Sequence, residues 1–414
     1  MNIPPLVYTS SSSSSFSSSP PPSPVYSYVP PVLVRQKPFE PETPKRSSKE
    51  NWLPQSKRTK LSHAKQRKVV VVCEKLGGHV LPAEFLSRYL VGDELGSGGF
   101  GFVMSATRYS TGEEVAVKFI YRHKVPQHSW VHDPVHGAVP AEVYVLLRTS
   151  RTPHQSIIRL YEYFADEQYF VLVTELHGTP WSRSGVSKRE PLGNVCANAQ
   201  NAQNAQDVVM DDGDLDTESD EPEIRYSQKR ESHDLFEMIE TRRSLSERQV
   251  RYVIRQLVDA LWFLDSLNIY HRDIKDENIL IDDTLKIKLI DFGSAVVLPQ
   301  TPSTPTTPTT PSGRVQFNRF YGTMQYAPVE VLKSQPYDAE KSDVWALGIL
   351  VYTCLTGKTP FRSAEDAIAN KWTLKRAVSP ECTKFIDRCL DKNPDSRASI
   401  YELVRERWWL VDLP

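Results

Sequence analysis

The spacing of apolar residues changes in the middle of this chain, and that change limits the possible folds more than any other feature. Between Tyr89 and Leu176, short runs rich in β-branched or aromatic residues alternate with turn residues. Runs of this kind predict a small antiparallel sheet. The predicted strands cover residues 90–95, 102–108, 114–120 and 170–174.

After residue 232 the pattern becomes helical. Ser246 and Gln249 form a capping box, and apolar residues then recur on one face at positions 250, 253, 254, 257, 261 and 264. Residues 344–352 are apolar on all sides, which predicts a helix buried among others. Another helix is expected to begin at Pro140. We therefore expect an α+β fold of two lobes, a small N-terminal antiparallel β lobe with one helix and a larger, mainly α-helical C-terminal lobe.

Three segments are too polar to belong to this core. Residues 1–68 are rich in serine and proline and then basic, residues 179–232 are polar and then acidic, and residues 298–318 contain a Thr-Pro repeat. Their few apolar groups cannot offset the entropy lost on ordering. We expect a disordered tail at 1–68 and two insertions within one folded domain at 86–413.

Composition argues against several classes of protein. The 50 basic and 51 acidic residues nearly balance, so neither nucleic acid nor a membrane is expected as the main partner. The five cysteines show neither metal-ligand spacing nor the density of a disulfide-rich secreted domain. We expect a cytoplasmic or nuclear protein. Basic residues at 45–46 and 57–60 fit a bipartite nuclear localisation signal, or equally an ordinary basic tail.

A glycine-rich stretch follows the first predicted strand. Gly96, Gly98 and Gly101 fit the pattern G-x-G-x-x-G-x-V, which ends at Val103. Glycines let backbone amides approach phosphate groups closely. A dinucleotide-binding fold uses the same glycines, but its loop opens a helix, whereas residues 102–108 are predicted to form a strand. The predicted hairpin therefore favours a loop that covers the phosphate groups of a nucleotide, rather than a dinucleotide-binding loop.

Lys118 lies on the next predicted strand, where its ammonium group can contact the α- and β-phosphates of a nucleotide. A lysine on a strand is more often a solvated charge. Glu142, near the start of the helix expected at Pro140, is a candidate partner for an ion pair with Lys118.

The most informative segment runs from His271 to Asn278 and matches H-R-D-x-K-x-x-N. In this pattern Asp273 orients or deprotonates the substrate hydroxyl, Lys275 neutralises the γ-phosphate and Asn278 binds magnesium. Asp291 begins an Asp-Phe-Gly sequence and is expected to bridge metal and phosphates. Both motifs in this order argue against a solvated run of charges.

With these motifs, residues 86–413 resemble the protein kinase superfamily. Segments 175–178, 234–236, 271–281 and 291–295 are similar to the Pim and PAS-kinase branch of the calmodulin-kinase-like group, and segments 378–382 and 388–390 look especially Pim-like. Lys275 fits the serine/threonine pattern. The resemblance implies a non-specific serine/threonine protein kinase that uses ATP and Mg²⁺.

Two competing classes remain. A kinase-fold scaffold without turnover usually lacks metal-binding or catalytic residues, and none is missing here. An adaptor for nucleic acid would rest on the basic stretch 57–68 alone.

The resemblance also implies the nucleotide site. The glycine loop comprises Leu95, Gly96, Ser97, Gly98, Gly99, Phe100, Gly101, Phe102 and Val103. Leu95 and Val103, with Ala116 and Leu280, would enclose adenine. Thr174 would be the gatekeeper residue, and Glu175 to His177 the hinge. Asn278 and Asp291 would be the magnesium ligands.

Two structural roles follow from the same resemblance. Asp343 should tie the catalytic loop to the buried helix, and Glu330 should pair with Arg397. The family usually has Ala-Pro-Glu where this chain has Ala-Pro-Val-Glu, with Pro328 one position early. We expect an altered substrate-binding loop in an enzyme that remains active.

Four carboxylates, those of Asp234, Glu237, Asp276 and Glu277, are predicted to lie near a bound peptide. In the similar family the matching positions receive arginines that precede the target residue, and carboxylate pairs suit the planar guanidinium group. The alternative is that Asp234 caps its helix and Glu277 supports the loop.

The Thr-Pro repeat lies in the segment that kinases use as an activation loop. One hypothesis is that an upstream proline-directed kinase modifies Thr304, Thr307 or Thr310, and that Arg272 receives the added charge. The other is a tolerated surface insertion.

Overall fold

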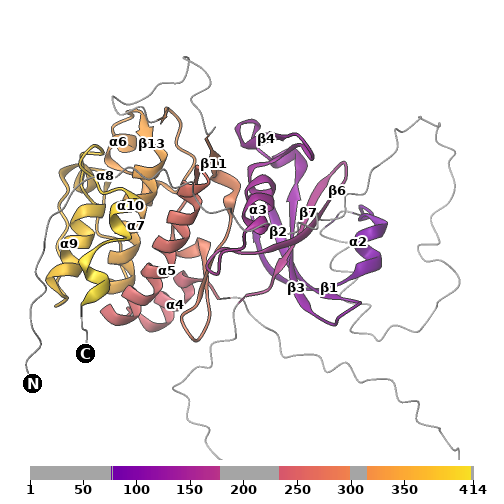
Figure 1. Cartoon of the computed structure of the whole chain (residues 1–414), viewed down its shortest axis with the longest axis horizontal. Helices are drawn as coiled ribbons and strands as arrows, with labels where there is room; N and C mark the ends of the chain where they lie inside the picture. Colours follow the sequence, from indigo (N-terminus) through magenta and orange to yellow (C-terminus); the bar gives the residue numbers. More distant parts are fainter. Residues whose placement is uncertain (1–75, 77, 178–232, 299–314, 412–414) are drawn as a thin grey trace, which may run out of the picture. The chain divides into compact units, whose positions relative to one another are not determined.

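The structure is a computed structural model that describes residues 76, 78–177, 233–298 and 315–411. The predictions for residues 1–68 and 179–232, and for residues 299–314 of the predicted insertion at 298–318, lie outside these described residues. Within the described part, a β lobe is followed by a helical lobe, as expected (Figure 1).

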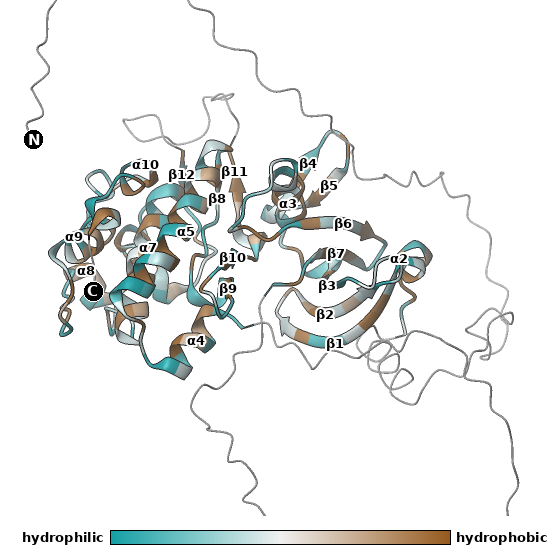
Figure 2. Cartoon of the chain, turned by 60° about the horizontal axis from the view of Figure 1, so that its bottom comes forward, coloured by the Kyte–Doolittle hydropathy of each residue, from teal (hydrophilic) through white to brown (hydrophobic). Residues whose placement is uncertain are grey.

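The β lobe is built on a five-stranded antiparallel sheet with the strand order β1-β2-β3-β7-β6 (Figure 2). The strands are β1 (Tyr89–Gly98), β2 (Gly101–Arg108), β3 (Glu114–Tyr121), β6 (Leu160–Ala165) and β7 (Tyr169–Glu175). The four predicted strands are confirmed. The sequence analysis missed β6, whose short alternation is broken by a register shift between Leu160 and Glu162.

The single long helix of this lobe is α3 (Ala141–Arg151). It begins one residue later than predicted, because Pro140 is its N-cap and also ends β5 (Gly137–Pro140). The hairpin of β4 (Trp130–Asp133) and β5 was not predicted, since each strand has only four residues, β4 ends in His132 and Asp133, and β5 begins with glycine and ends with proline.

The outer face of the sheet is covered by residues that precede β1. Leu81 and Phe85 are buried against Phe119, and Phe85 belongs to the short helix α2 (Ala83–Arg88). The Phe85 ring packs on those of Tyr89 and Phe164. The packed β lobe therefore begins before residue 86.

The helical lobe contains the larger part of a second apolar core, which also covers the inner face of the sheet. Its helices are α4 (Leu235–Arg242), α5 (Glu247–Ser266), α6 (Val329–Leu332), α7 (Ala339–Thr356), α8 (Ala364–Ala369), α9 (Pro380–Cys389) and α10 (Ile400–Leu403). Three small ladders join β8 (Ile269–Tyr270) to β11 (Val296–Val297), β9 (Ile279–Ile281) to β10 (Ile287–Leu289), and β12 (Gln316–Phe317) to β13 (Tyr337–Asp338).

Local sequence explains the two central helices. Ser246 and Gln249 form both bonds of the predicted capping box at the start of α5. Helix α7 is buried on nearly all sides, as its apolar sequence predicts. A Cβ atom at Gly348 would lie 2.7 Å from Cys389 Cβ, so glycine permits the close packing of α7 on α9. None of the helices in the described part has the length and apolar character of a membrane span.

Candidate active site

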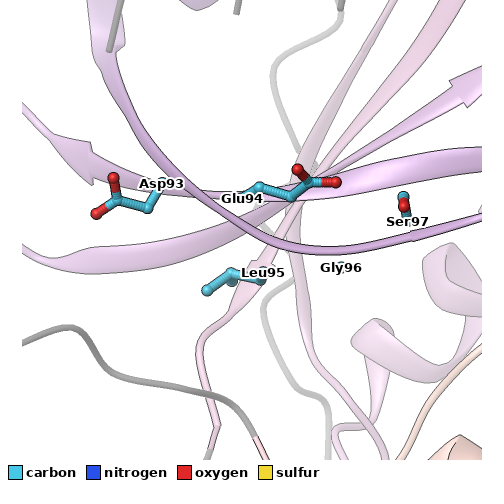
Figure 3. A pocket seen from close by; sticks show the side chains of 5 residues that line it. All are labelled: Asp93, Glu94, Leu95, Gly96 and Ser97. Carbon is cyan, nitrogen blue, oxygen red and sulfur yellow. The ribbon is translucent and has the colours of Figure 1, made fainter. Parts of the chain in front are cut away.

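A cleft of about 460 Å³ lies between the sheet and the helical lobe. The residues predicted for the glycine loop, Leu95 to Val103, and for the adenine site, including Ala116 and Leu280, line it. Lys275, predicted to neutralise the γ-phosphate, is not among the lining residues. The side chains of Leu95 and Glu94 extend to opposite sides of β1 (Figure 3). Leu95 lines the cleft, and Glu94 does not.

The glycine loop is the hairpin between β1 and β2. A Cβ atom at Gly101 would lie 1.9 Å from the Phe119 carbonyl oxygen, so only glycine fits there. At Gly96, Gly98 and Gly99 an added Cβ would meet no other atom within 4 Å. These three residues are exposed, and glycine leaves room for a polyphosphate chain to approach the backbone there.

Lys118 on β3 joins three elements at the cleft. Its Nζ donates to both carboxylate oxygens of Glu142 on α3, at 2.6 and 2.8 Å, and to Asp291 Oδ1 at 3.1 Å. Burial lowers the pKa of Lys118, but the charges of Asp291 and Glu142 outweigh burial and raise it. The same lysine lowers the pKa of Asp291. Lys118 is therefore a cation, and Asp291 an anion, at neutral pH.

The Asp273 carboxylate is held from two sides. Thr323 donates to Oδ1 through its backbone nitrogen and through Oγ1, both at 2.8 Å. Asn278 Nδ2 donates to Oδ2 at 3.1 Å. Lys275 Nζ lies 3.7 Å from Oδ2 and 2.7 Å from Glu277 Oε2. The catalytic loop thus gathers its predicted residues around one carboxylate.

Asp343 on α7 fixes the backbone of this loop, as predicted. Its two oxygens accept hydrogen bonds from the backbone nitrogens of His271, at 2.8 Å, and Arg272, at 2.7 Å. Arg272 has a left-handed backbone, with φ of 63°, and its Nε donates to the Ser294 carbonyl oxygen. The loop is therefore tied both to α7 and to the segment after Asp291.

The hinge side chains point into a polar network of the protein itself. Glu175 Oε1 accepts from Lys288 Nζ at 2.6 Å and from the Arg159 backbone nitrogen at 2.8 Å. His177 Nε2 donates to the Lys286 carbonyl oxygen at 3.0 Å. The backbone of this segment, rather than its side chains, is suited to bind adenine.

Magnesium and nucleotide fit these groups. The bond of Asn278 to Asp273 uses Nδ2, so the amide oxygen can be a cation ligand beside the ionised Asp291. Magnesium is usually held by one or two protein ligands together with phosphate oxygens. Asn278, Asp291 and the glycine loop all line the same cleft.

Glu330 and Arg397 form the predicted ion pair. Two bonds of 2.8 Å join the guanidinium group to the carboxylate, and the side chains of Arg397 and Glu330 are 0% and 4% exposed. Glu330 lies in α6, which Pro328 precedes. The early proline therefore does not displace the glutamate from its partner.

The four acidic residues differ in their surroundings. Asp234 Oδ1 caps α4 by accepting from the Glu237 backbone nitrogen, and burial together with nearby carboxylates raises the pKa of Asp234 to about 6. Asp276 is only 7% exposed and accepts a hydrogen bond from the Tyr326 hydroxyl. Asp234 and Glu277 line the cleft, and Glu237 contacts His233. Asp276 is thus buried, whereas Asp234 is partly exposed and Glu237 and Glu277 are exposed.

Sequence reasoning missed Thr323, which donates two hydrogen bonds to the Asp273 carboxylate. It lies 50 residues from Asp273, in a segment that the repeat and the early proline make irregular. The adjacent small residues Gly322 and Thr323 were the sequence feature that could have indicated close packing of this segment on the loop that carries Asp273. Arg272, predicted to receive a phosphate, contacts the rings of Phe317 and Tyr321.

Comparison with known proteins agrees with this geometry. A family model, "Protein kinase domain", matches residues 89–190 and 225–409. A PAS domain-containing serine/threonine-protein kinase of Mus musculus is 31% identical over 78% of this chain and 19% of its own length. Serine/threonine-protein kinase PSK1 of Saccharomyces cerevisiae is 26% identical over 77% of the chain and 19% of its own. Serine/threonine-protein kinase pim-2 of Danio rerio is 30% identical over 79% of the chain and 86% of its own. This chain thus spans about a fifth of the mouse and yeast proteins and most of the zebrafish one.

Proposed function

The chain belongs to the protein kinase family, and from that membership we propose that it transfers the γ-phosphoryl group of ATP to serine or threonine hydroxyls of proteins. The observation that carries the proposal is the contact of Lys118 with both Glu142 and Asp291. Active kinases need this arrangement of lysine, helix glutamate and metal-binding aspartate. The names of the relatives support serine and threonine as targets.

Different residues of the site contribute to different parts of phosphoryl transfer. The substrate oxygen forms a bond to the γ-phosphorus, the bond from that phosphorus to the β,γ-bridging oxygen breaks, and ADP leaves. Asp273 orients the hydroxyl and receives its proton, with Thr323 and Asn278 fixing the carboxylate. Lys118 orients the nucleotide phosphates. Asn278 and Asp291 would hold magnesium, which neutralises phosphate charge when bound.

Substitution at Asp273 tests this proposal. Asp273→Asn should abolish peptide phosphorylation while leaving ATP affinity nearly intact, because Asp273 does not line the nucleotide cleft. The measurement pairs a radiolabel transfer assay with nucleotide titration. A variant that transfers phosphate at the wild-type rate would contradict the mechanism, and a wild-type protein that binds ATP without transfer would favour a scaffold.

We further propose that substrates carry arginine on the N-terminal side of the target residue. Asp234 and Glu277 lie at the cleft and Glu237 is next to Asp234 on α4. Such a group of carboxylates can hold guanidinium through charge-assisted bonds, each contributing about 1.5–3 kcal/mol, or roughly tenfold or more in kcat/KM.

The test compares peptides with arginine or alanine at each of the positions two to five before the serine. The variant is Asp234→Asn with Glu237→Gln, because asparagine can still cap α4 while the negative charge is lost. We expect the arginine preference to fall by about tenfold. Glu240→Gln, on an exposed position of the same helix, is the control. Full arginine preference in the double variant would contradict this assignment.

A further inference from the structure

The segment between β3 and α3 contacts the helical lobe at two neighbouring residues. These lie in a single helical turn, Gln127–Ser129, just before β4. The His128 imidazole stacks on the Tyr321 ring, with centroids 3.5 Å apart and planes inclined by 16°. Ser129 Oγ donates to the Gly293 carbonyl oxygen at 3.2 Å. One turn of the β lobe thus contacts both Gly293 of the Asp-Phe-Gly sequence and Tyr321.

Tyr321 is also held by the helical lobe. The Arg272 guanidinium carbon lies 5.2 Å from the centroid of the Tyr321 ring. Ser294 Oγ donates to the Tyr321 carbonyl oxygen at 3.1 Å. The tyrosine therefore lies where the β lobe meets the loop that carries the catalytic aspartate.

The position of Tyr321 bears on catalysis through its neighbours in sequence. Thr323, two residues later, donates both of its hydrogen bonds to Asp273 Oδ1. Between them, a Cβ atom at Gly322 would lie 2.3 Å from the Arg272 carbonyl oxygen, so this stretch packs tightly on the catalytic loop. A shift of Tyr321 would move Thr323 away from the carboxylate that it orients.

The charges around His128 are compatible with stacking. Partial burial, and then the positive charges of Arg272 and Arg319, lower the pKa of the His128 imidazole. The ring is neutral at pH 7, and it stacks on Tyr321 as an uncharged aromatic group.

We propose that His128 and Tyr321 form an aromatic contact that positions the catalytic carboxylate from the β lobe, acting through Thr323. Both are positioning residues. The inference rests on the proposed kinase function, and it adds a means by which closure of the β lobe fixes Asp273. An aromatic pair contributes about 0.5–1.5 kcal/mol, so its loss should reduce the competent population about two- to tenfold.

The experiment measures kcat and KM for peptide and ATP in the full chain. His128→Ala and Tyr321→Ala should each lower kcat about two- to tenfold with little change in KM for ATP. The double variant should be no worse than the more impaired of the two single variants. His128→Phe should restore most of kcat, because phenylalanine stacks without a positive charge. His132→Ala, at an exposed position of the adjacent strand, is the control.

Backbone hydrogen exchange of residues 316–323 gives a second measurement that needs no activity. Exchange should speed up in His128→Ala and return towards the wild-type rate in His128→Phe. Wild-type exchange in His128→Ala, additive losses of kcat, or failure of His128→Phe to rescue would overturn the inference. If the wild-type chain transfers no phosphate, the proposed function fails, and the exchange measurement still decides whether the contact orders this segment.

Discussion

Loss of the Glu330 carboxylate should destabilise the helical lobe more than most single substitutions. Arg397 donates to both oxygens of Glu330 and also to the backbone carbonyl oxygens of Asp391 and Lys341. Its guanidinium carbon lies 5.0 Å from the Trp345 ring centroid. With its side chain fully buried, Arg397 has no route to water when its partner is neutralised.

The magnitude follows from this burial. Glu330→Gln keeps the size of the side chain and leaves a buried cation without its counter-charge, which typically costs about 3–5 kcal/mol. For a domain of this size, each kcal/mol lowers the melting temperature by about 2–4 °C. We therefore expect a fall of about 6–20 °C.

Thermal unfolding followed by circular dichroism measures this effect. Glu240→Gln, an exposed glutamate on α4, is the control and should change the melting temperature little. Replacing both Glu330 and Arg397 by methionine should cost less than the sum of the single changes, because no charge then remains buried. A fall in Glu330→Gln as small as that of the control would refute the reasoning.

Three further outcomes can be checked. The pKa of Asp234 is about 6, so its negative charge is lost as the pH falls through that value. The preference of the wild-type protein for arginine peptides should therefore decline between pH 7.5 and 5.5, whereas the preference of Asp234→Asn should not change with pH. A wild-type preference that is the same at both pH values would contradict this. Phe85→Ala should cost about 3–5 kcal/mol by thermal or urea unfolding, because the ring is fully buried, whereas Leu86→Ala at an exposed position should cost little. Deletion of residues 301–311 should leave peptide phosphorylation unchanged, because Arg272 already contacts Ser294 and two aromatic rings; lost activity would favour the regulatory hypothesis.

The grouping of the candidate site residues was predictable because each motif is short and its residues lie close together in sequence. Asp273, Lys275 and Asn278 lie within six residues of one another, and a loop of that length can hardly separate them. The pairing of Lys118 with Glu142 could be predicted from a strand and a helix that local sequence patterns indicate. The additional contact of Lys118 with Asp291, 173 residues away in the sequence, could not be predicted without the three-dimensional structure.

Other features depended on packing that local pattern does not encode. The short strands of β4, β5 and β6 carry too few alternating apolar residues to stand out from turns. Asp276 was predicted to lie near a bound peptide, yet its side chain is buried and accepts a hydrogen bond from Tyr326, 50 residues later. A carboxylate's exposure is decided by such distant partners, and sequence spacing does not reveal them.

Asp234 shows why the two alternatives for the acidic residues do not exclude each other. Its Oδ1 caps α4 by accepting a hydrogen bond from the Glu237 backbone nitrogen. This bond holds the carboxylate at the edge of the cleft in one orientation. The second oxygen is then preorganised to accept from a guanidinium group, at no further cost in side-chain entropy. The raised pKa of Asp234 supports this proposal, because a partly buried carboxylate gains more from a nearby cation than a solvated carboxylate would. Capping and the proposed arginine binding are therefore compatible in a single side chain, and Asp234→Asn tests them separately, because it keeps the cap and removes the charge.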